Sequence, residues 1–361
     1  MRRVCFGALA AALGSGILAA SSAAGTSNRR NVGATPASPI ISARATRECP
    51  ANVRRLRVDV WAFTAPWDPR SAASVACVAP ALSVLISGWL RLDSLTAMPV
   101  AAYPDTTKVP HGPHRFLLVT TYQRDRFHRE TITRLASDPD LRARAAGAVA
   151  DWAKGHGYQG LVLDFEGLAR DDTSALAVVV KTFVDSAHHQ HVRPVTVAVV
   201  PTDTLVYAGR HLAAADLLLA MLYDQHWANG PPGPIASASW FRQALALRIA
   251  EVGAGRLVAG LPTYGYLWKS PAPAQVLSYS DAKQQTAQLG IPLSRDSASG
   301  MLHFFRSDSA EAWVADAQLT RALVASAESL GVRRFALWRL GLEDPGIWKA
   351  AFGKAPLAPG K

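Results

Sequence analysis

Eight short apolar segments, separated by longer stretches of helical pattern, constrain the fold of this chain more than any other feature. Such alternation is typical of parallel strands joined by crossover helices. Eight strands favour a closed barrel over an open doubly wound sheet, so we expect an α/β fold of the (β/α)8 TIM barrel type. The predicted strands are Leu56–Phe63, Leu82–Ile86, Arg115–Thr121, Gly160–Glu166, Pro194–Val200, Leu217–Tyr223, Leu257–Tyr264 and Arg334–Trp338.

The helix predicted between the third and fourth strands has clear ends. Asp138 is suited to cap its N-terminus, Pro139 occupies its first turn, and the helix ends at Gly155 and Gly157. Apolar residues repeat along one of its faces from position 141 to position 152, as in an amphipathic helix. Further helices are expected at about 173–189, 238–252 and 317–330.

Extra sequence separates the seventh strand from the last long helix. Residues 271–316 contain a helical stretch near Ser280–Leu289 and two short apolar segments, Met301–Phe305 and Ala312–Ala315. We therefore expect a small α+β insertion carried by the barrel rather than a separate domain. The barrel, with this insertion, is expected to span residues 51–355.

The first 24 residues are predicted to be a secretory signal peptide. Two arginines precede an apolar run, and small residues stand at positions 22 and 24, where a signal peptidase reads them. An uncleaved membrane anchor is the alternative, but Gly14, Ser15 and Gly16 interrupt the run, which falls short of the ~20 apolar residues of a spanning helix. We expect an exported protein, periplasmic, envelope-bound or extracellular, with no stable membrane span after cleavage.

Residues 25–50 are rich in Ser, Ala, Thr, Arg and Pro without an apolar period, which predicts a disordered linker. The exported chain keeps Cys49 and Cys77 in an oxidising compartment. A disulfide between them and two unpaired thiols are both compatible with the sequence.

Charge and histidine spacing limit the partners. Cleavage of the signal peptide removes Arg2 and Arg3 and no acids, so the net charge falls from +11 to +9. A basic surface suits an anionic envelope polymer, although a merely solvated surface is equally common. Because no Lys/Arg cluster interleaves with aromatic residues, we do not expect nucleic-acid binding.

Histidines group at 188–191 and flank a Gly-Pro pair at 111–114. Neither group has the helical i, i+4 spacing with a Glu that zinc hydrolases use, so we expect surface histidines, with no metal and no cofactor. The sequence does not indicate an oligomeric state.

The fourth predicted strand ends in two carboxylates. Side chains alternate along a strand. One side therefore carries Val162, Asp164 and Glu166, and the other carries Leu161, Leu163 and Phe165. The apolar set should face the helices, which leaves Asp164 and Glu166 pointing into the barrel about 6.6 Å apart along the strand. Structural ion pairs are the alternative, but no Lys or Arg lies within this strand, and Glu166 falls at the C-terminal rim where barrel enzymes do their chemistry.

This strand resembles the strand-four signature of glycoside hydrolase family 18, the chitinase-like barrels, whose pattern is Asp-Gly-x-Asp-x-Asp-x-Glu. Gly160, Asp164 and Glu166 match the pattern. Gln159 and Val162 stand where the first two Asp residues would be.

Three other segments extend the resemblance over about Leu56 to Trp348. Met221-Leu222-Tyr223-Asp224 is similar to the family's strand-six Met-x-Tyr-Asp. Residues 261–268 and 336–344 resemble the ends of strands seven and eight in the branch that includes spore-cortex and germination-type N-acetylglucosaminidases. Trp338 stands at the position of the sugar-stacking tryptophan.

The resemblance implies a glycosidase that cleaves a β-linked N-acetylglucosamine polymer, of the peptidoglycan or chitin type, by retaining catalysis. The sugar's own 2-acetamido carbonyl attacks the anomeric carbon, so one protein acid suffices. Glu166 would protonate the leaving oxygen and then activate water. Asp164 would orient the acetamido group, and the Tyr223 hydroxyl would hydrogen-bond its carbonyl oxygen. The substrate-binding candidates are Asp224, Trp338, Met221, Tyr264 and Trp268, with core packing as the alternative for the aromatic ones.

Val162 is the departure from the family pattern that bears on activity. A valine cannot exchange a proton with Asp164. It dries the neighbourhood of Asp164, which raises the pKa of that carboxyl, and it removes a like charge, which lowers the same pKa. The sign stays open at this point, and a catalytically weak or inactive glycan-binding, lectin-like barrel is the alternative function.

Overall fold

The structure, a computed structural model, describes residues 49, 56–103, 105, 109 and 112–353. The predicted signal peptide, residues 1–24, and nearly all of the predicted linker lie outside the described residues. Within the described part, no helix combines the length and the apolar character that crossing a membrane requires.

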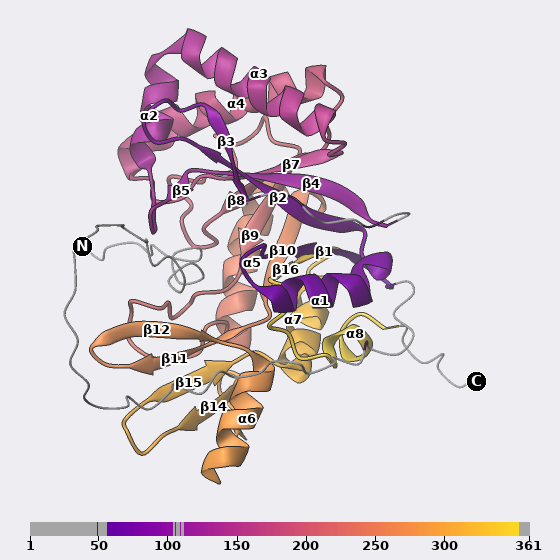
Figure 1. Ribbon diagram of the computed structural model, residues 1–361, viewed down its shortest axis with the longest axis vertical. Helices are drawn as coiled ribbons and strands as arrows, with labels where there is room; N and C mark the ends of the chain where they lie inside the picture. Colours follow the sequence, from indigo (N-terminus) through magenta and orange to yellow (C-terminus); the bar gives the residue numbers. More distant parts are fainter. Residues whose placement is uncertain (1–48, 50–55, 104, 106–108, 110–111, 354–361) are drawn as a thin grey trace, which may run out of the picture.

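Eight parallel strands close into a barrel (Figure 1). They are β1 (Asp59–Phe63), β2 (Val84–Leu92), β4 (His114–Thr120), β7 (Gly160–Asp164), β8 (Val195–Val199), β9 (Leu217–Met221), β10 (Leu257–Pro262) and β16 (Arg334–Trp338). Because β1 pairs in parallel with both β16 and β2, the sheet has no gap. The predicted (β/α)8 barrel is confirmed, and each predicted strand overlaps an observed one.

Helices pack around the outside of the barrel. They are α1 (Pro69–Val78), α2 (Arg129–Ser137), α3 (Pro139–Gly155), α4 (Thr173–His189), α5 (Ala238–Val252), α7 (Ala317–Ser329) and α8 (Ile347–Ala350). The start of α3 is as predicted: the Asp138 side chain accepts a hydrogen bond of 2.9 Å from the Leu141 backbone N–H, and Pro139 follows the cap.

Two connections depart from the alternation of strand and helix. The chain between β8 and β9, residues 200–216, forms consecutive turns. After β2 the chain returns as β3 (Pro99–Tyr103), which pairs antiparallel with the end of β2. A short hairpin, β5 (Tyr122–Gln123) and β6 (Arg126–Phe127), follows β4.

The predicted insertion forms a small antiparallel sheet beside the barrel (Figure 1). Its strands are β11 (Gly265–Lys269), β12 (Ala272–Leu277), β13 (Ser294–Arg295), β14 (Leu302–Phe305) and β15 (Glu311–Val314), with α6 (Tyr279–Leu289) against one face. Strand β11 lies wholly ahead of residue 271, where the insertion was predicted to begin, so the sheet begins directly after β10. Gly265 is required there, because a Cβ atom would lie 2.1 Å from the Trp313 carbonyl oxygen.

Two apolar clusters hold these layers together. The large one fills the space between the barrel strands and the surrounding helices. The small one lies between the insertion sheet and α6 and includes Leu267, Phe304, Val314 and Ala282. Cys49 and Cys77 form a disulfide with their Cα atoms 5.2 Å apart.

Candidate active site

Asp164 and Glu166 lie at the C-terminal end of β7 and are nearly fully buried, with 2% and 4% of their surfaces exposed. The Phe165 ring between them meets Phe183 of α4 edge to face, with centroids 5.9 Å apart. Phe165 therefore faces the helices, and the two carboxylates lie on the barrel side, as the strand alternation predicts.

The surroundings of the two carboxylates favour the protonated state. Burial raises the pKa of Asp164 to about 7, although a hydrogen bond from the Thr120 hydroxyl, 3.3 Å away, lowers it. Burial also raises the pKa of Glu166 well above its usual value, and the charges of Asp164 and Asp224 raise it further. The net shift of the Asp164 pKa is therefore upward with burial as its largest cause, and its neighbour on the same face of the strand, Val162, is completely buried too.

Each of these carboxylates keeps one oxygen free. Asp164 Oδ1 and Glu166 Oε1 are buried and accept no hydrogen bond from the described residues. Buried polar atoms are normally satisfied, so an unsatisfied pair at a barrel rim indicates a site that a ligand or water completes. A protonated carboxyl with a free oxygen is suited to general acid catalysis.

Tyr223 and Asp224 follow directly after β9 and face the same carboxylates. The charges of Glu166, Asp164 and Asp224 all add to burial in raising the pKa of Tyr223. The Tyr223 hydroxyl has no hydrogen-bond partner among the described residues and can serve a ligand. Its ring passes close over Gly260 of β10, where a Cβ atom would lie 3.1 Å from Tyr223 Cε1.

Two tyrosines hold Asp224. The Tyr264 hydroxyl donates to Asp224 Oδ1, and the Tyr266 hydroxyl donates to Oδ2 at 3.5 Å. Burial nevertheless raises the pKa of Asp224 to about 7, because desolvation outweighs both donors. Asp224 has a φ of +58°, a left-handed backbone that few residues other than glycine adopt, and Asp is one of the few.

Trp338 ends β16 and is buried among aromatic edges. Its centroid lies 5.0 Å from that of Phe63 at the end of β1 and 6.1 Å from that of Trp89 in β2. These contacts fix the plane of the indole. The next residue, Arg339, donates from Nη1 to Asp68 Oδ2 at 2.9 Å and places its guanidinium 5.6 Å from the Trp67 ring centroid.

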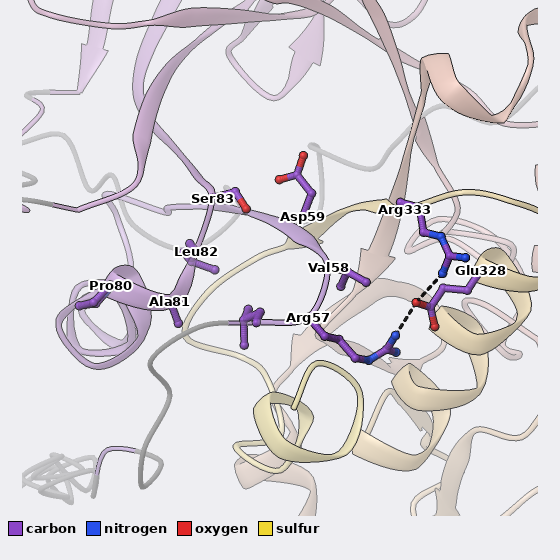
Figure 2. Close-up of a pocket in the computed structure, with 10 residues that line it drawn as sticks. Arg57, Val58, Asp59, Pro80, Ala81, Leu82, Ser83, Glu328 and Arg333 are labelled. Carbon is purple, nitrogen blue, oxygen red and sulfur yellow. Dashed lines mark hydrogen bonds and ion pairs between the residues drawn. The ribbon is translucent and has the colours of Figure 1, made fainter. Parts of the chain in front are cut away.

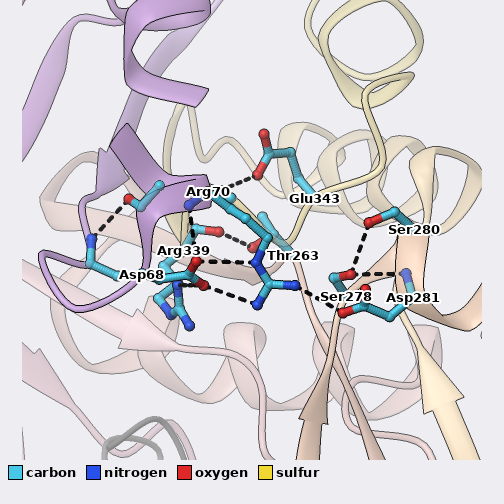
Figure 3. A network of polar contacts seen from close by, with 11 residues as sticks. Asp68, Arg70, Thr263, Ser278, Ser280, Asp281, Arg339 and Glu343 are labelled. Carbon is cyan, nitrogen blue, oxygen red and sulfur yellow. Dashed lines mark hydrogen bonds and ion pairs between the residues drawn. The ribbon is translucent and has the colours of Figure 1, made fainter. Parts of the chain in front are cut away.

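Behind Trp338 a polar network ties the end of β16 to α1 and to α6 (Figure 3). Arg70 donates to Asp68 and, at 2.9 Å, to Asp281 of α6. Glu343 accepts 2.6 Å hydrogen bonds from the Ser74 hydroxyl and the Gly341 N–H. The network makes the barrel rim and the insertion one connected unit.

Met221 and Trp268 take different positions. Met221 is the last residue of β9, next to the site. Trp268 lies on β11 of the insertion, and the ring of Tyr266 stands between it and Tyr264, with centroid distances of 5.3 Å on each side. Trp268 also lines a cavity of about 300 Å³, together with Asn229 and four prolines of two facing turns. Trp268 is therefore separated from Tyr264 by the ring of Tyr266.

A larger cavity, about 800 Å³, opens at the N-terminal ends of β1 and β16 (Figure 2). It contains Glu328, which pairs with Arg57 and, at 3.1 Å, with Arg333. Because this cavity lies at the opposite end of the barrel from Glu166, we assign it no part in the chemistry. Among the residues that the structure describes, no three His, Cys, Asp or Glu side chains are grouped so as to hold a metal ion.

The structure adds Thr120, Tyr207 and Tyr266 to the site. Thr120 is the register partner of Asp164 across β4 and β7, so aligning the predicted strand ends could have found it. Tyr266 lies in the strand-seven segment that resembles the family. Tyr207 lies in the irregular chain after β8, where the sequence offers no periodic signal.

Comparison with known proteins gives relatives in both sequence and structure. No family model matches the chain. It is 23% identical over 243 residues to the uncharacterized glycosylase YvbX of Bacillus subtilis, covering 62% of this chain and 69% of that protein. It is 24% identical over 251 residues to the cortical fragment-lytic enzyme of the same organism, covering 64% of this chain and only 58% of the relative.

Solved structures share the fold. The spore cortex-lytic enzyme SleL of Bacillus cereus superimposes with a TM-score of 0.70 at 18% identity, covering 82% of this chain and 74% of that one. A chitinase from Chromobacterium violaceum gives a TM-score of 0.71 at 19% identity, covering 81% of this chain and 98% of that one.

Proposed function

We propose that this chain, a chitinase-like barrel related to the spore cortex-lytic enzymes, is an exported glycosidase that cleaves β-linked N-acetylglucosamine polymers of the peptidoglycan or chitin type. One observation carries the proposal: Glu166 and Asp164 are buried together at the C-terminal rim, each with a free oxygen and a raised pKa. The rim is where barrel folds place their catalytic groups.

The chemistry that these residues suit is substrate-assisted retention. Glu166, kept protonated by burial, donates its proton to the leaving glycosidic oxygen and afterwards removes a proton from the attacking water. The carbonyl oxygen of the substrate's acetamido group attacks the anomeric carbon, so no protein nucleophile is needed. The pKa of Asp164 is about 7, so its ionised form is available at neutral pH; in that form it accepts the acetamido N–H and balances the positive charge that develops there.

Tyr223, Asp224 and Trp338 complete the binding of the reacting sugar. The unpaired Tyr223 hydroxyl donates to the acetamido oxygen, and Asp224, held by its two tyrosines, binds a sugar hydroxyl. Trp338 offers an apolar plane for the pyranose ring. Tyr264 acts through Asp224, whereas Met221 borders the site and Trp268 lies at its outer end.

The names of the relatives support the substrate class. Two of them are a cortical fragment-lytic enzyme and a spore cortex-lytic enzyme, and a class V chitinase from Nicotiana tobaccum has been solved in complex with NAG4. The Cys49–Cys77 disulfide supports export, because disulfides persist in oxidising compartments.

The test is product analysis. Purified protein is incubated with N-acetylglucosamine oligomers and with peptidoglycan, and new reducing ends are identified by mass. Glu166→Gln should lower kcat by roughly 10²- to 10⁴-fold with the fold intact. Glu328→Gln, the same change at the opposite end of the barrel, should retain activity. Equal activity of Glu166→Gln and the unmodified protein would contradict the mechanism.

Val162 favours a second candidate, a glycan-binding barrel without turnover. It is fully buried where the family pattern has an Asp that shares a proton with the next one. This alternative predicts oligomer affinity with no products in the same incubation, so one experiment separates the two candidates.

A further inference from the structure

The chain between β8 and β9 is held rigidly although it forms no helix. Residues 200–216 consist of turns, yet Val206, Tyr207 and Leu212 are buried in the main core. Irregular chain of this length is normally mobile unless other groups satisfy its carbonyls. One side chain of α5 does so here.

Arg248 of α5 is completely buried, with 0% of its surface exposed. Its guanidinium donates to four main-chain carbonyls of the turns: those of Pro201 at 3.1 Å, Asp203 at 2.6 Å, Tyr207 at 2.7 Å, and Val200. It also pairs with Glu251 at 2.7 Å. A buried guanidinium is tolerated only when its donors are satisfied, and these carbonyls satisfy them.

The turns carry a tyrosine that reaches the catalytic strand. The hydroxyl of Tyr207, whose surface is 2% exposed, donates a 2.9 Å hydrogen bond to the carbonyl oxygen of Phe165. That carbonyl belongs to the peptide unit that joins Phe165 to Glu166. The Phe165 ring is fixed on its other side by Phe183, so the peptide is held from two directions.

We propose that Tyr207 and Arg248 are positioning residues for Glu166: Arg248 fixes the turns, the turns fix Tyr207, and Tyr207 fixes the peptide that aims the Glu166 carboxyl. The effect on catalysis rests on the proposed function, whereas the positioning of the Glu166 peptide by Tyr207 and Arg248 does not. Misplacement of a catalytic group by about 1 Å can cost on the order of 10²-fold in rate, so the aim of this peptide matters.

Tyr207→Phe removes only the hydroxyl, and Arg248→Met removes the guanidinium. Arg256→Met is the matched control, because Arg256 donates to the Ala215 carbonyl at 2.7 Å and the Leu212 carbonyl at 3.4 Å, at the far end of the same turns. Arg248→Met and Arg256→Met both remove hydrogen bonds to these turns, but only Arg248 and Tyr207 lie on the path to Phe165.

Two measurements follow. For hydrolysis of an N-acetylglucosamine oligomer, we expect kcat to fall about tenfold in Tyr207→Phe and in Arg248→Met with KM nearly unchanged, and to stay at the wild-type value in Arg256→Met. In hydrogen–deuterium exchange, the peptide covering residues 165–168 should exchange about fivefold faster in the first two variants and unchanged in the control.

Unchanged exchange of this peptide in Tyr207→Phe overturns the proposal, as does an equal loss of kcat in Arg256→Met. If Arg248→Met does not fold, Tyr207→Phe alone decides. If the unmodified protein shows no hydrolysis, the proposed function fails, and the exchange measurement still decides whether Tyr207 and Arg248 hold the Glu166 peptide.

Discussion

The Tyr264 hydroxyl donates a hydrogen bond to Asp224, and the charge of Asp224 in turn raises the pKa of Glu166. A tyrosine in the link between barrel and insertion therefore acts on Glu166, the proposed catalytic acid, through one intermediate carboxylate.

Asp224→Asn should move the alkaline limb of the pH–rate profile to lower pH. Removing a negative charge lowers the pKa of Glu166, so Glu166 loses its proton, and with it the general acid, at a lower pH. We expect a displacement of up to about one unit in kcat/KM against pH. Asp185→Asn, on the exposed face of α4, serves as control and should leave the limb in place. A limb that moves upward in Asp224→Asn contradicts this assignment.

The free energy of unfolding should fall as the pH rises from about 4 to above 7. The folded-state pKa values of Asp164 and Asp224 are raised to about 7, and that of Glu166 is raised too. A group whose pKa is higher in the folded state than in the unfolded state contributes its full stabilisation at pH values below its unfolded-state pKa. That stabilisation is lost as the pH rises through its folded-state pKa. Urea midpoints at acidic and mildly alkaline pH measure the fall.

The double variant Asp164→Asn, Asp224→Asn isolates this contribution. Because an amide does not ionise, the difference between the two pH values should be smaller than in the unmodified protein, while histidines and surface carboxylates contribute equally to both. A difference of the same size in the double variant would mean that these two carboxyls are not responsible.

Trp338→Ala should weaken oligosaccharide binding on the order of tenfold, since the indole plane supplies apolar contact to the sugar. Titration calorimetry on the Glu166→Gln background avoids turnover during the measurement. Trp152→Ala is the control, because that indole stacks on His156, 4.4 Å away at the end of α3. Undiminished affinity in Trp338→Ala would remove Trp338 from the site.

Replacing both Cys49 and Cys77 by serine should lower the free energy of unfolding by about 3.5 kcal/mol, because the disulfide closes a loop whose ends are 28 residues apart. Activity at low temperature should persist, since Cys77 lies in α1 and neither cysteine belongs to the candidate site. Denaturant unfolding compares the two proteins. An unchanged denaturation midpoint would show that removing the disulfide does not increase the conformational entropy of the unfolded chain enough to affect stability.

The barrel was predictable because its signals are local and periodic. The apolar run at 160–166 alternates in direction as a strand must, and the carboxylates fall on the predicted side. Asp138 and Pro139 mark the start of α3 in the sequence as clearly as in the structure. The predicted boundaries are less accurate: the apolar pattern predicts a seventh strand that continues to Tyr264, whereas β10 ends at Pro262.

Other parts of the site left no such signal. Arg248 binds main-chain carbonyls, which every residue has, so the composition of residues 200–216 does not reveal it. Tyr207 reaches Phe165 across 42 positions, and only the closed barrel brings the two together. The upward shift of the Asp164 pKa comes from the burial of that carboxyl, and the residue types along the strand do not reveal how deeply it is buried.

Only Thr263 and Tyr264 separate the barrel strand β10 from the insertion strand β11. The Thr263 hydroxyl donates a hydrogen bond to the Arg339 carbonyl at 2.6 Å, and the Tyr264 hydroxyl donates one to Asp224. Both residues of this link are therefore held in place by side-chain hydrogen bonds. The insertion is consequently not an interchangeable module. Replacing or deleting it at this junction would disturb the hydrogen bonds that hold Asp224 and so change the pKa of Glu166, which follows a strand three positions away from β10 in the barrel.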